Sequence, residues 1–155
     1  MNKAEISEKL SNLGITLGTP PKPGGSYVAV NVRQNTAFVA IQFPIQDDKF
    51  FFQGRLGEQV STEQGYEAAR MSAANVLKQI NSHVGFERIV GLNHIDVYYQ
   101  AGDNWDDGPK VANGASDLFL LALGERGQHT RAIMGVHKLP RSHSVAIVAS
   151  FSVKE

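Results

Sequence analysis

Apolar residues near the N-terminus recur at a spacing that predicts one short helix. Ile6, Leu10 and Leu13 lie at helical spacing, and Gly14 suits the end of that helix. Residues 18–25 hold three prolines and three glycines, which is typical of an extended connector. We therefore expect residues 1–25 to form an N-terminal helix and a connector that leads into the rest of the domain.

The segments that follow predict three strands. Apolar residues alternate over residues 27–32, and residues 37–43 are more uniformly apolar. Asp47 and Asp48 supply turn chemistry, and residues 49–53, which include three phenylalanines, then read as a third strand.

Two long helices have the clearest local signals. Ser61 and Gln64 form a capping box, and the helix that they start should run to about His83. One face of it carries a small and apolar stripe made of Ala69, Ala73, Val76, Leu77, Ile80 and Val84. The second helix is expected over residues 109–123, because Pro109 suits a first helical turn.

Three further strands complete the pattern. One is expected over residues 88–99, between the two long helices. The tail reads as two strands joined by a short turn: Arg131 opens the first, residues 141–144 are polar, and residues 145–151 form an apolar run. We expect these last two strands to pair as a hairpin.

This order of elements predicts a single α+β domain over residues 1–155. The order contains two strand-rich halves, each covered by one long helix, so both helices should lie on one face of a mostly antiparallel sheet. The other face would then need a cover. The apolar content of residues 49–53 and 145–151 favours a partner subunit in that role.

Composition and charge exclude several classes of protein. Fifteen basic and fifteen acidic residues cancel, so no overall field attracts nucleic acid or an anionic membrane. The lack of cysteine excludes disulfides, thiolate chemistry and cysteine-ligated metals. The N-terminus is unlike a signal peptide, and no apolar run approaches the roughly 20 residues of a membrane span. We expect a cytoplasmic protein with no membrane association.

Motifs for metals, cofactors and nucleophiles are weak. The five histidines form no metal-binding pair at helical spacing, and no serine lies in a Gly-x-Ser-x-Gly segment. His137 and His143 could meet across the terminal turn, where exposed or hydrogen-bonded histidines are the simpler interpretation. We expect no metal and no cofactor.

Arg131 is the strongest candidate for binding chemistry. Its guanidinium is always charged, and its planar fork of donors suits a carboxylate or a phosphate. The alternative is a solvated or ion-paired arginine at a strand end. Asn113, near the start of the second long helix, could contact a ligand, cap the helix or face solvent.

The spacing of Arg131, Val136 and Leu139-Pro140 ahead of a long terminal strand resembles the closing segment of the YjgF/RidA reactive-intermediate deaminases. Upstream segments resemble the same family in the right order, namely residues 35–44, 54–57, 67–77 and 109–119. The likeness covers residues 6–153 and is closest to a longer subfamily with an extra N-terminal helix and Asn-Gly-Ala-Ser-Asp in the second long helix. It implies a homotrimer of chorismate-mutase-like (bacillus-type) subunits.

The resemblance also implies where a ligand binds. In the family the ligand lies in a cleft between subunits, and the arginine that matches Arg131 grips the substrate carboxylate. Backbone groups at the position of Ile133 line the site, and an asparagine that matches Asn113 lies nearby. The substrates are imines and enamines such as 2-aminoacrylate, which are hydrolysed to a keto acid and ammonia. The implied partner is therefore a small carboxylate-bearing metabolite.

Two departures from the family pattern bear on activity. The family's Ser-Gly ahead of Gln-x-Pro is Ala40-Ile41 here, so the branched side chain of Ile41 would line and narrow the pocket. The glutamate usual in the last strand, a water-activating group, falls at Ala146. An alanine cannot accept a proton from water.

Three functions therefore compete. The first is RidA-like hydrolysis of 2-imino and 2-enamino acids, with a backbone carbonyl or an ordered water in place of the missing acid. The second is a non-catalytic trimer that binds small carboxylates. The third is a ribonuclease, an activity with which the family is often labelled. A neutral chain without an exposed basic or aromatic track supports the third function least.

Overall fold

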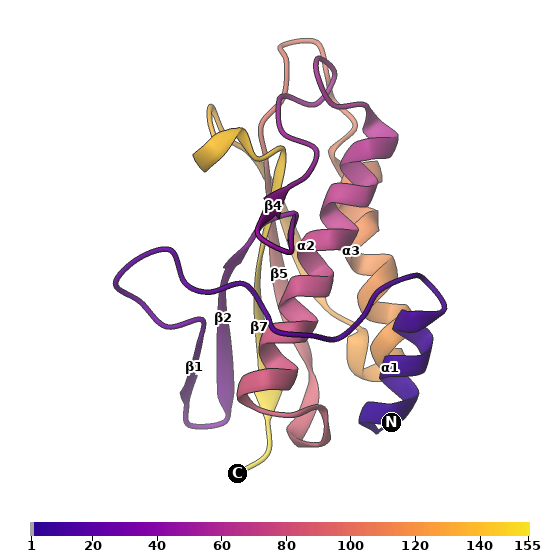
Figure 1. Ribbon diagram of the computed structural model, residues 1–155, viewed down its shortest axis with the longest axis vertical. Coiled ribbons are helices and arrows are strands. Elements are labelled where there is room, and N and C mark those ends of the chain that lie inside the picture. The colour runs from indigo at the N-terminus through magenta and orange to yellow at the C-terminus, as the bar shows by residue number, and fades with distance from the viewer. Residues whose placement is uncertain (1) are drawn as a thin grey trace.

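A five-stranded sheet with strand order β1-β2-β7-β5-β6 forms the centre of the computed structural model, which describes residues 2–155 (Figure 1). Its strands are β1 Val30–Arg33, β2 Thr36–Gln42, β5 Ile89–Tyr99, β6 Thr130–Gly135 and β7 Val145–Val153. Neighbouring strands are antiparallel, except that β5 and β6 are parallel. The mostly antiparallel sheet expected from the sequence is confirmed.

Two long helices, α2 Thr62–His83 and α3 Gly108–Leu123, pack side by side on one face of this sheet (Figure 1). The capping box at the start of α2 is present: Ser61 Oγ accepts from the Gln64 N–H, and Gln64 Oε1 accepts from the Ser61 N–H. A shorter helix, α1 Lys3–Ser11, packs against α3. The α+β layer with both long helices on one face is confirmed.

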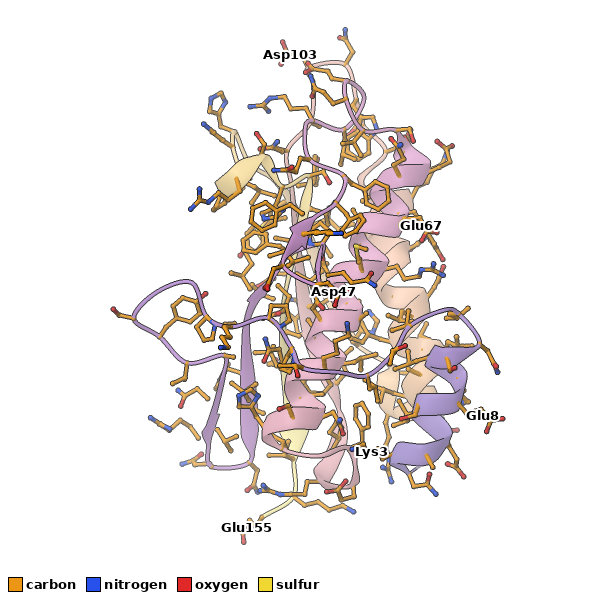
Figure 2. The ribbon with its side chains drawn as sticks, in the orientation of Figure 1. Lys3, Glu8, Asp47, Glu67, Asp103 and Glu155 are labelled. Atoms are coloured by element: carbon orange, nitrogen blue, oxygen red, sulfur yellow. The ribbon has the colours of Figure 1, made fainter. Side chains whose placement is uncertain are left out.

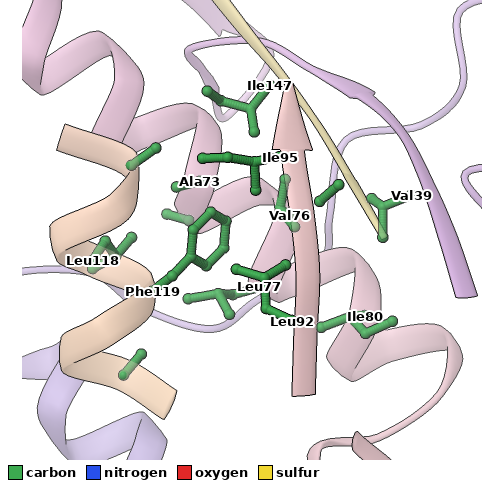
Figure 3. Close-up of a cluster of buried hydrophobic side chains, with 14 of the residues drawn as sticks. Val39, Ala73, Val76, Leu77, Ile80, Leu92, Ile95, Leu118, Phe119 and Ile147 are labelled. Atoms are coloured by element: carbon green, nitrogen blue, oxygen red, sulfur yellow. The ribbon is translucent and has the colours of Figure 1, made fainter. Parts of the chain in front are cut away.

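The hydrophobic core lies between these helices and the sheet. Figure 3 shows Phe119 of α3 and Leu77 of α2 among the buried side chains that meet Ile95 of β5. The helices come close together at Gly114, where an added Cβ would lie 2.0 Å from the Tyr66 carbonyl oxygen. Only glycine lets α2 and α3 pack at this distance.

The exterior of the molecule is polar at its extremities. Figure 2 shows Glu8, Asp103 and Glu155 projecting outward from different sides of the molecule. Among residues 2–155, no helix combines the length and the apolar composition that a membrane span requires.

The last two strands are not neighbours, so the expected terminal hairpin is wrong. β7 inserts between β2 and β5, and β6 lies on the far side of β5. A strand that follows a crossover helix pairs parallel with the strand before that helix, which places β6 beside β5 after α3. Residues 136–144 then carry the chain past β5 to the central position. Alternate residues of β7 pack into the core: Val145, Ile147, Ala149, Phe151 and Val153.

Residues 49–53 do not form a strand of the main sheet, contrary to expectation. β4, Lys49–Phe50, pairs with β3, Ile45–Gln46, in a separate two-stranded hairpin. The turn residues Asp47 and Asp48 have φ values of 52° and 60°, a left-handed conformation that aspartate tolerates. The apolar residues of β4 therefore do not line the open sheet face, whereas Ala146 and Val148 of β7 do. The large apolar side chain that β2 presents there is Phe38, which is 53% exposed.

Candidate functional site

The Arg131 guanidinium is positioned by two neutral side chains of α3. Arg131 lies on the edge strand β6, and its Nη1 donates hydrogen bonds to Asn113 Oδ1 at 2.8 Å and to Ser116 Oγ at 3.1 Å. Asn113 and Ser116 are three residues apart on the helix, so they lie on the same face of it. Of the roles considered for Asn113, the structure shows solvent exposure and no helix cap, because α3 already begins at Gly108.

A second hydrogen-bond chain fixes Ser116. His129 Nδ1 lies 2.6 Å from the Gly127 carbonyl oxygen, which can only accept, so Nδ1 carries the proton. In the neutral ring Nε2 is then an acceptor, and Ser116 Oγ donates to it over 2.9 Å. The hydroxyl oxygen keeps its lone pairs for the Arg131 donor. His129 thus orients the serine that orients the arginine.

Arg131 keeps an uncompensated positive charge in a half-buried position. Within residues 2–155 it takes part in no ion pair, and its Nε and Nη2 atoms make no hydrogen bond. Asn113 and Ser116 place the guanidinium without cancelling its charge, because both are neutral. Two unused donor nitrogens on a planar fork match the two oxygens of a carboxylate. Of the two alternatives considered for Arg131, an ion-paired arginine is not what residues 2–155 show.

Ile133 lies two residues further along β6, on the same face of the sheet as Arg131. It pairs with Val97 of β5, and its Cγ2 would lie 3.3 Å from a Cβ added to Gly108 at the start of α3. β6 is an edge strand, so one row of its backbone N–H and C=O groups has no neighbouring strand in this chain. The structure therefore brings Arg131, Asn113 and Ile133 together.

Ile41 lies away from these residues within one chain. β2, which carries it, is separated from β6 by β7 and β5, a distance of about 14 Å at ordinary strand spacing. Ala146 is also apart: it is fully buried, and it pairs with Tyr98 on the face opposite the helices. Arg131 reaches the helix face, so Arg131 and Ala146 lie on opposite faces of the sheet.

Ile41 instead lines a cavity of about 160 Å³ at the junction of β2, the N-terminal connector and the segment that precedes β7. His143 lines the same cavity and is only 2% exposed. Its ring stacks on Phe43 with centroids 4.5 Å apart and meets the edge of Phe50 at 4.9 Å. Burial, followed by the nearby charge of Arg141, lowers the pKa of His143 below its usual value.

The polar side chains that line this cavity form only part of the hydrogen bonds that they could make. Gln79 of α2 donates from Nε2 to the Pro21 carbonyl at 2.7 Å and to Gln42 Oε1 at 3.2 Å, while its own Oε1 is buried and unpartnered among residues 2–155. The Nδ1 of His143 is likewise buried without a partner in that part of the chain. The expectation of an exposed or hydrogen-bonded His143 is therefore wrong.

Sequence reasoning missed Ser116, His129 and Gln79, and it interpreted His143 as an exposed or hydrogen-bonded turn residue. Ser116 left a readable signal, because it follows Asn113 by three residues in a helix and so shares a face with it. The environments of Gln79 and His143 left none, because the elements that meet at the cavity are far apart in the chain.

Metal binding has little support in the side-chain arrangement. Within residues 2–155, the histidine, aspartate and glutamate side chains form no group of three that could hold a metal ion. His94 and Asp96 form a pair on the open sheet face, with Nε2 and Oδ1 2.9 Å apart.

The chain is similar to other proteins over nearly its full length. Protein TCP17 of Trypanosoma cruzi is 31% identical over 146 residues, which cover 93% of this chain and 91% of that protein. The crystal structure of Atu1372 from Agrobacterium tumefaciens, a protein of unknown function, has a TM-score of 0.92 at 28% identity. It covers 97% of this chain and 94% of its own.

A structure from Shewanella oneidensis MR-1 described as a "putative endoribonuclease" has a TM-score of 0.91 at 25% identity. The alignment covers 96% of this chain and 99% of that one. Residues 8–153 match the family model described as "YjgF/chorismate mutase-like, putative endoribonuclease". The match spans both long helices and every strand of the sheet. The resemblance found in the sequence is confirmed, and the chain belongs to the YjgF/chorismate mutase-like family.

Proposed function

We propose that the protein hydrolyses reactive 2-imino and 2-enamino acids to 2-keto acids and ammonia, with Arg131 binding the substrate carboxylate. The observation that carries this proposal is the half-buried guanidinium of Arg131. Asn113 and Ser116 hold it at Nη1, while Nε and Nη2 have no partner within residues 2–155. A carboxylate can accept from both free nitrogens in a two-pronged contact.

The carboxylate is common to the substrate and the product, so Arg131 supplies binding and orientation. An anchored substrate presents its C=N carbon to water in one orientation, and this kind of positioning lowers the barrier to a reaction with water. Ile133 lies next along β6, so its backbone groups would flank the bound carboxylate.

A homotrimer with the open sheet faces inward would complete this site. Ile41 and Ala146 cannot meet Arg131 within one chain, whereas a neighbouring copy could bring its own β2 to the edge strand β6. The exposed Phe38 on the open face of β2 is an apolar side chain that a subunit contact would cover. The proposed cleft combines Arg131, Asn113 and Ile133 of one subunit with Ile41 of the next.

A second function, binding of small carboxylates without chemistry, is favoured by a specific observation. The side chains hydrogen-bonded in the chain Arg131, Asn113, Ser116 and His129 include no carboxylate, and the position of the family glutamate holds Ala146. Such a protein would keep the anion anchor and lack a group to activate water.

A competition assay separates the two functions. An L-amino-acid oxidase generates the imine, semicarbazide traps it, and an imine hydrolase lowers the yield of semicarbazone. We expect the wild type to lower this yield and Arg131→Ala to leave it near the protein-free value. Arg33→Ala is the matched control, because Arg33 is an exposed arginine on β1 whose Nη1 bonds the neighbouring Val32 carbonyl.

Calorimetry with pyruvate gives the second readout. Binding of pyruvate that depends on Arg131, without any effect on the semicarbazone yield, would support the non-catalytic binder and reject the hydrolase. Equal pyruvate binding by wild type and Arg131→Ala would reject both functions.

A further inference from the structure

The cavity beside Ile41 contains two buried polar atoms that the chain leaves unsatisfied. Gln79 is 1% exposed and His143 is 2% exposed, yet Gln79 Oε1 and His143 Nδ1 have no partner within residues 2–155. A buried polar atom without a hydrogen bond costs free energy, so native structures pair nearly all of them. Both side chains line the same cavity, which places an unpaired amide oxygen and an imidazole in its wall.

The orientation of the Gln79 amide is fixed by its hydrogen bonds. Its Nε2 faces two acceptors, the Pro21 carbonyl and Gln42 Oε1, so a flipped amide would place oxygen against oxygen. The unpaired atom is therefore an acceptor, and it adds to the polar character of the cavity wall next to His143.

His143 is held rigidly with its ring nitrogens free. Phe43 stacks on one face of the ring and Phe50 meets it edge-on, while the side chain makes no hydrogen bond within residues 2–155. Burial and the charge of Arg141 lower the pKa of His143, so the ring is neutral near pH 7. A neutral imidazole with a free nitrogen is able to accept a proton from a bound molecule.

The charges around the cavity favour an anionic substrate. Lys22 and Arg141 are the charged residues in its lining, Tyr27 is the other titratable one besides His143, and the lining includes no carboxylate. The volume of about 160 Å³ corresponds to roughly five waters, so a small metabolite fits and a nucleotide does not.

We propose that His143 is the proton-transfer residue of the hydrolysis, in place of the carboxylate that Ala146 cannot supply. This inference rests on the proposed function and names the group that the function lacks at the Arg131 site. In the proposed cleft, Ile41 lines both the ligand site and the cavity that contains His143. His143 of one subunit therefore serves the carboxylate anchor of its neighbour.

In the first proton step, the oxygen of a water molecule bonds to the iminium carbon, and His143 accepts one proton from that water. The carbinolamine nitrogen takes this proton, the C–N bond breaks with its electron pair on ammonia, and the hydroxyl proton passes through His143 to the ammonia. Iminium and water give keto acid and ammonium, and His143 returns to its neutral form.

Two substitutions at one position test this role. His143→Gln keeps a polar side chain that cannot accept a proton, and His143→Phe keeps a flat ring that can stack on Phe43. His137→Gln is the control, because His137 is an exposed histidine of the same segment. We expect both His143 variants to fold and to bind pyruvate as the wild type does, with kcat for imine hydrolysis lowered by about a hundredfold or more.

The pH dependence of kcat/KM separates proton transfer by His143 from a purely structural role, because a residue that only packs would not change this dependence. Wild-type kcat/KM should fall on the acid side as His143 becomes protonated, and this limb should be absent in His143→Gln. Folded His143 variants with kcat within a few-fold of wild type, or with a loss in KM alone, would refute the role of His143 while the proposed function stands. A wild type without imine hydrolysis would refute the proposed function, and this inference with it.

Discussion

Arg131 and Asn113 meet across the contact between β6 and α3, through a 2.8 Å hydrogen bond from Nη1 to Oδ1. The two residues are 18 positions apart in the sequence. Asn113 is neutral, so this hydrogen bond fixes the position of the guanidinium and leaves its positive charge uncompensated. The half-buried cation is the property of this chain from which its function is inferred.

Asn113→Ala should weaken pyruvate binding about fivefold. The substitution removes one of the two hydrogen bonds that position Nη1, and a single such bond contributes about 1 kcal/mol. Titration calorimetry measures the change in Kd. Asn104→Ala, at an exposed loop position, is the control. A Kd that does not change would mean that Ser116 alone positions the guanidinium.

Arg131→Ala should weaken pyruvate binding about tenfold to a hundredfold, because charge-assisted hydrogen bonds contribute about 1.5–3 kcal/mol. Arg131→Lys keeps the charge and loses the planar fork, so it should recover only part of the affinity. Calorimetry of both variants, with Arg33→Ala as the control, measures the Kd for pyruvate and so ranks the three proteins. Wild-type affinity in Arg131→Lys would show that the positive charge, and not the planar pair of donors, determines binding.

Mixed trimers should regain activity that neither parent has. If Arg131 and His143 of adjacent subunits share a site, random mixing of Arg131→Ala and His143→Gln chains restores both residues at about a quarter of the sites in a closed ring. Co-expression with two affinity tags, followed by the semicarbazide assay, measures this. Sedimentation should give the mass of three chains.

No recovery in mixed trimers would place Arg131 and His143 in separate sites. Mixing two preparations of Arg131→Ala is the matched control, and it should stay inactive. A mass of one or two chains would contradict the trimer itself.

Gly114→Ala should destabilise the protein by about 1–3 kcal/mol, as overpacking of a tight contact does. The added Cβ would lie 2.0 Å from the Tyr66 carbonyl oxygen, so α2 and α3 would have to separate. Thermal unfolding measures the loss. Gly18→Ala is the control, because a Cβ there meets nothing within 4 Å. An equal Tm for both variants would contradict the close helix contact.

Lys78→Met should raise Tm at pH 7. Burial lowers the pKa of Lys78 from 10.5, an effect that the charge of Asp47 partly opposes. As pH falls through about 10.5 the unfolded chain binds this proton before the native chain does, so the free energy of unfolding decreases and stays lower at neutral pH.

The gain from Lys78→Met should therefore be larger at pH 7 than at pH 10.5. Lys49→Met is the control, because Lys49 is exposed on the β3–β4 hairpin. A gain that is the same at both pH values would point to hydrophobic contact in place of relieved burial of charge.

Local chemistry made the helices predictable from the sequence. The capping box of Ser61 and Gln64 and the apolar stripe of α2 act within a few residues of one another, so the printed sequence contains all the partners. The same holds for α3, whose start was expected at Pro109 and lies at Gly108. Arg131 and Asn113 could be chosen because their chemistry and the family resemblance pointed to them.

The order of strands and the surroundings of single side chains were decided only by the tertiary structure. β7 could pair with β6 or pass to the centre of the sheet, and the sequence does not distinguish these arrangements, because either one buries an apolar strand. His143 reads as an exposed turn residue. It is buried because Phe43 and Phe50 reach it from distant segments, and packing between distant segments has no local sequence signal.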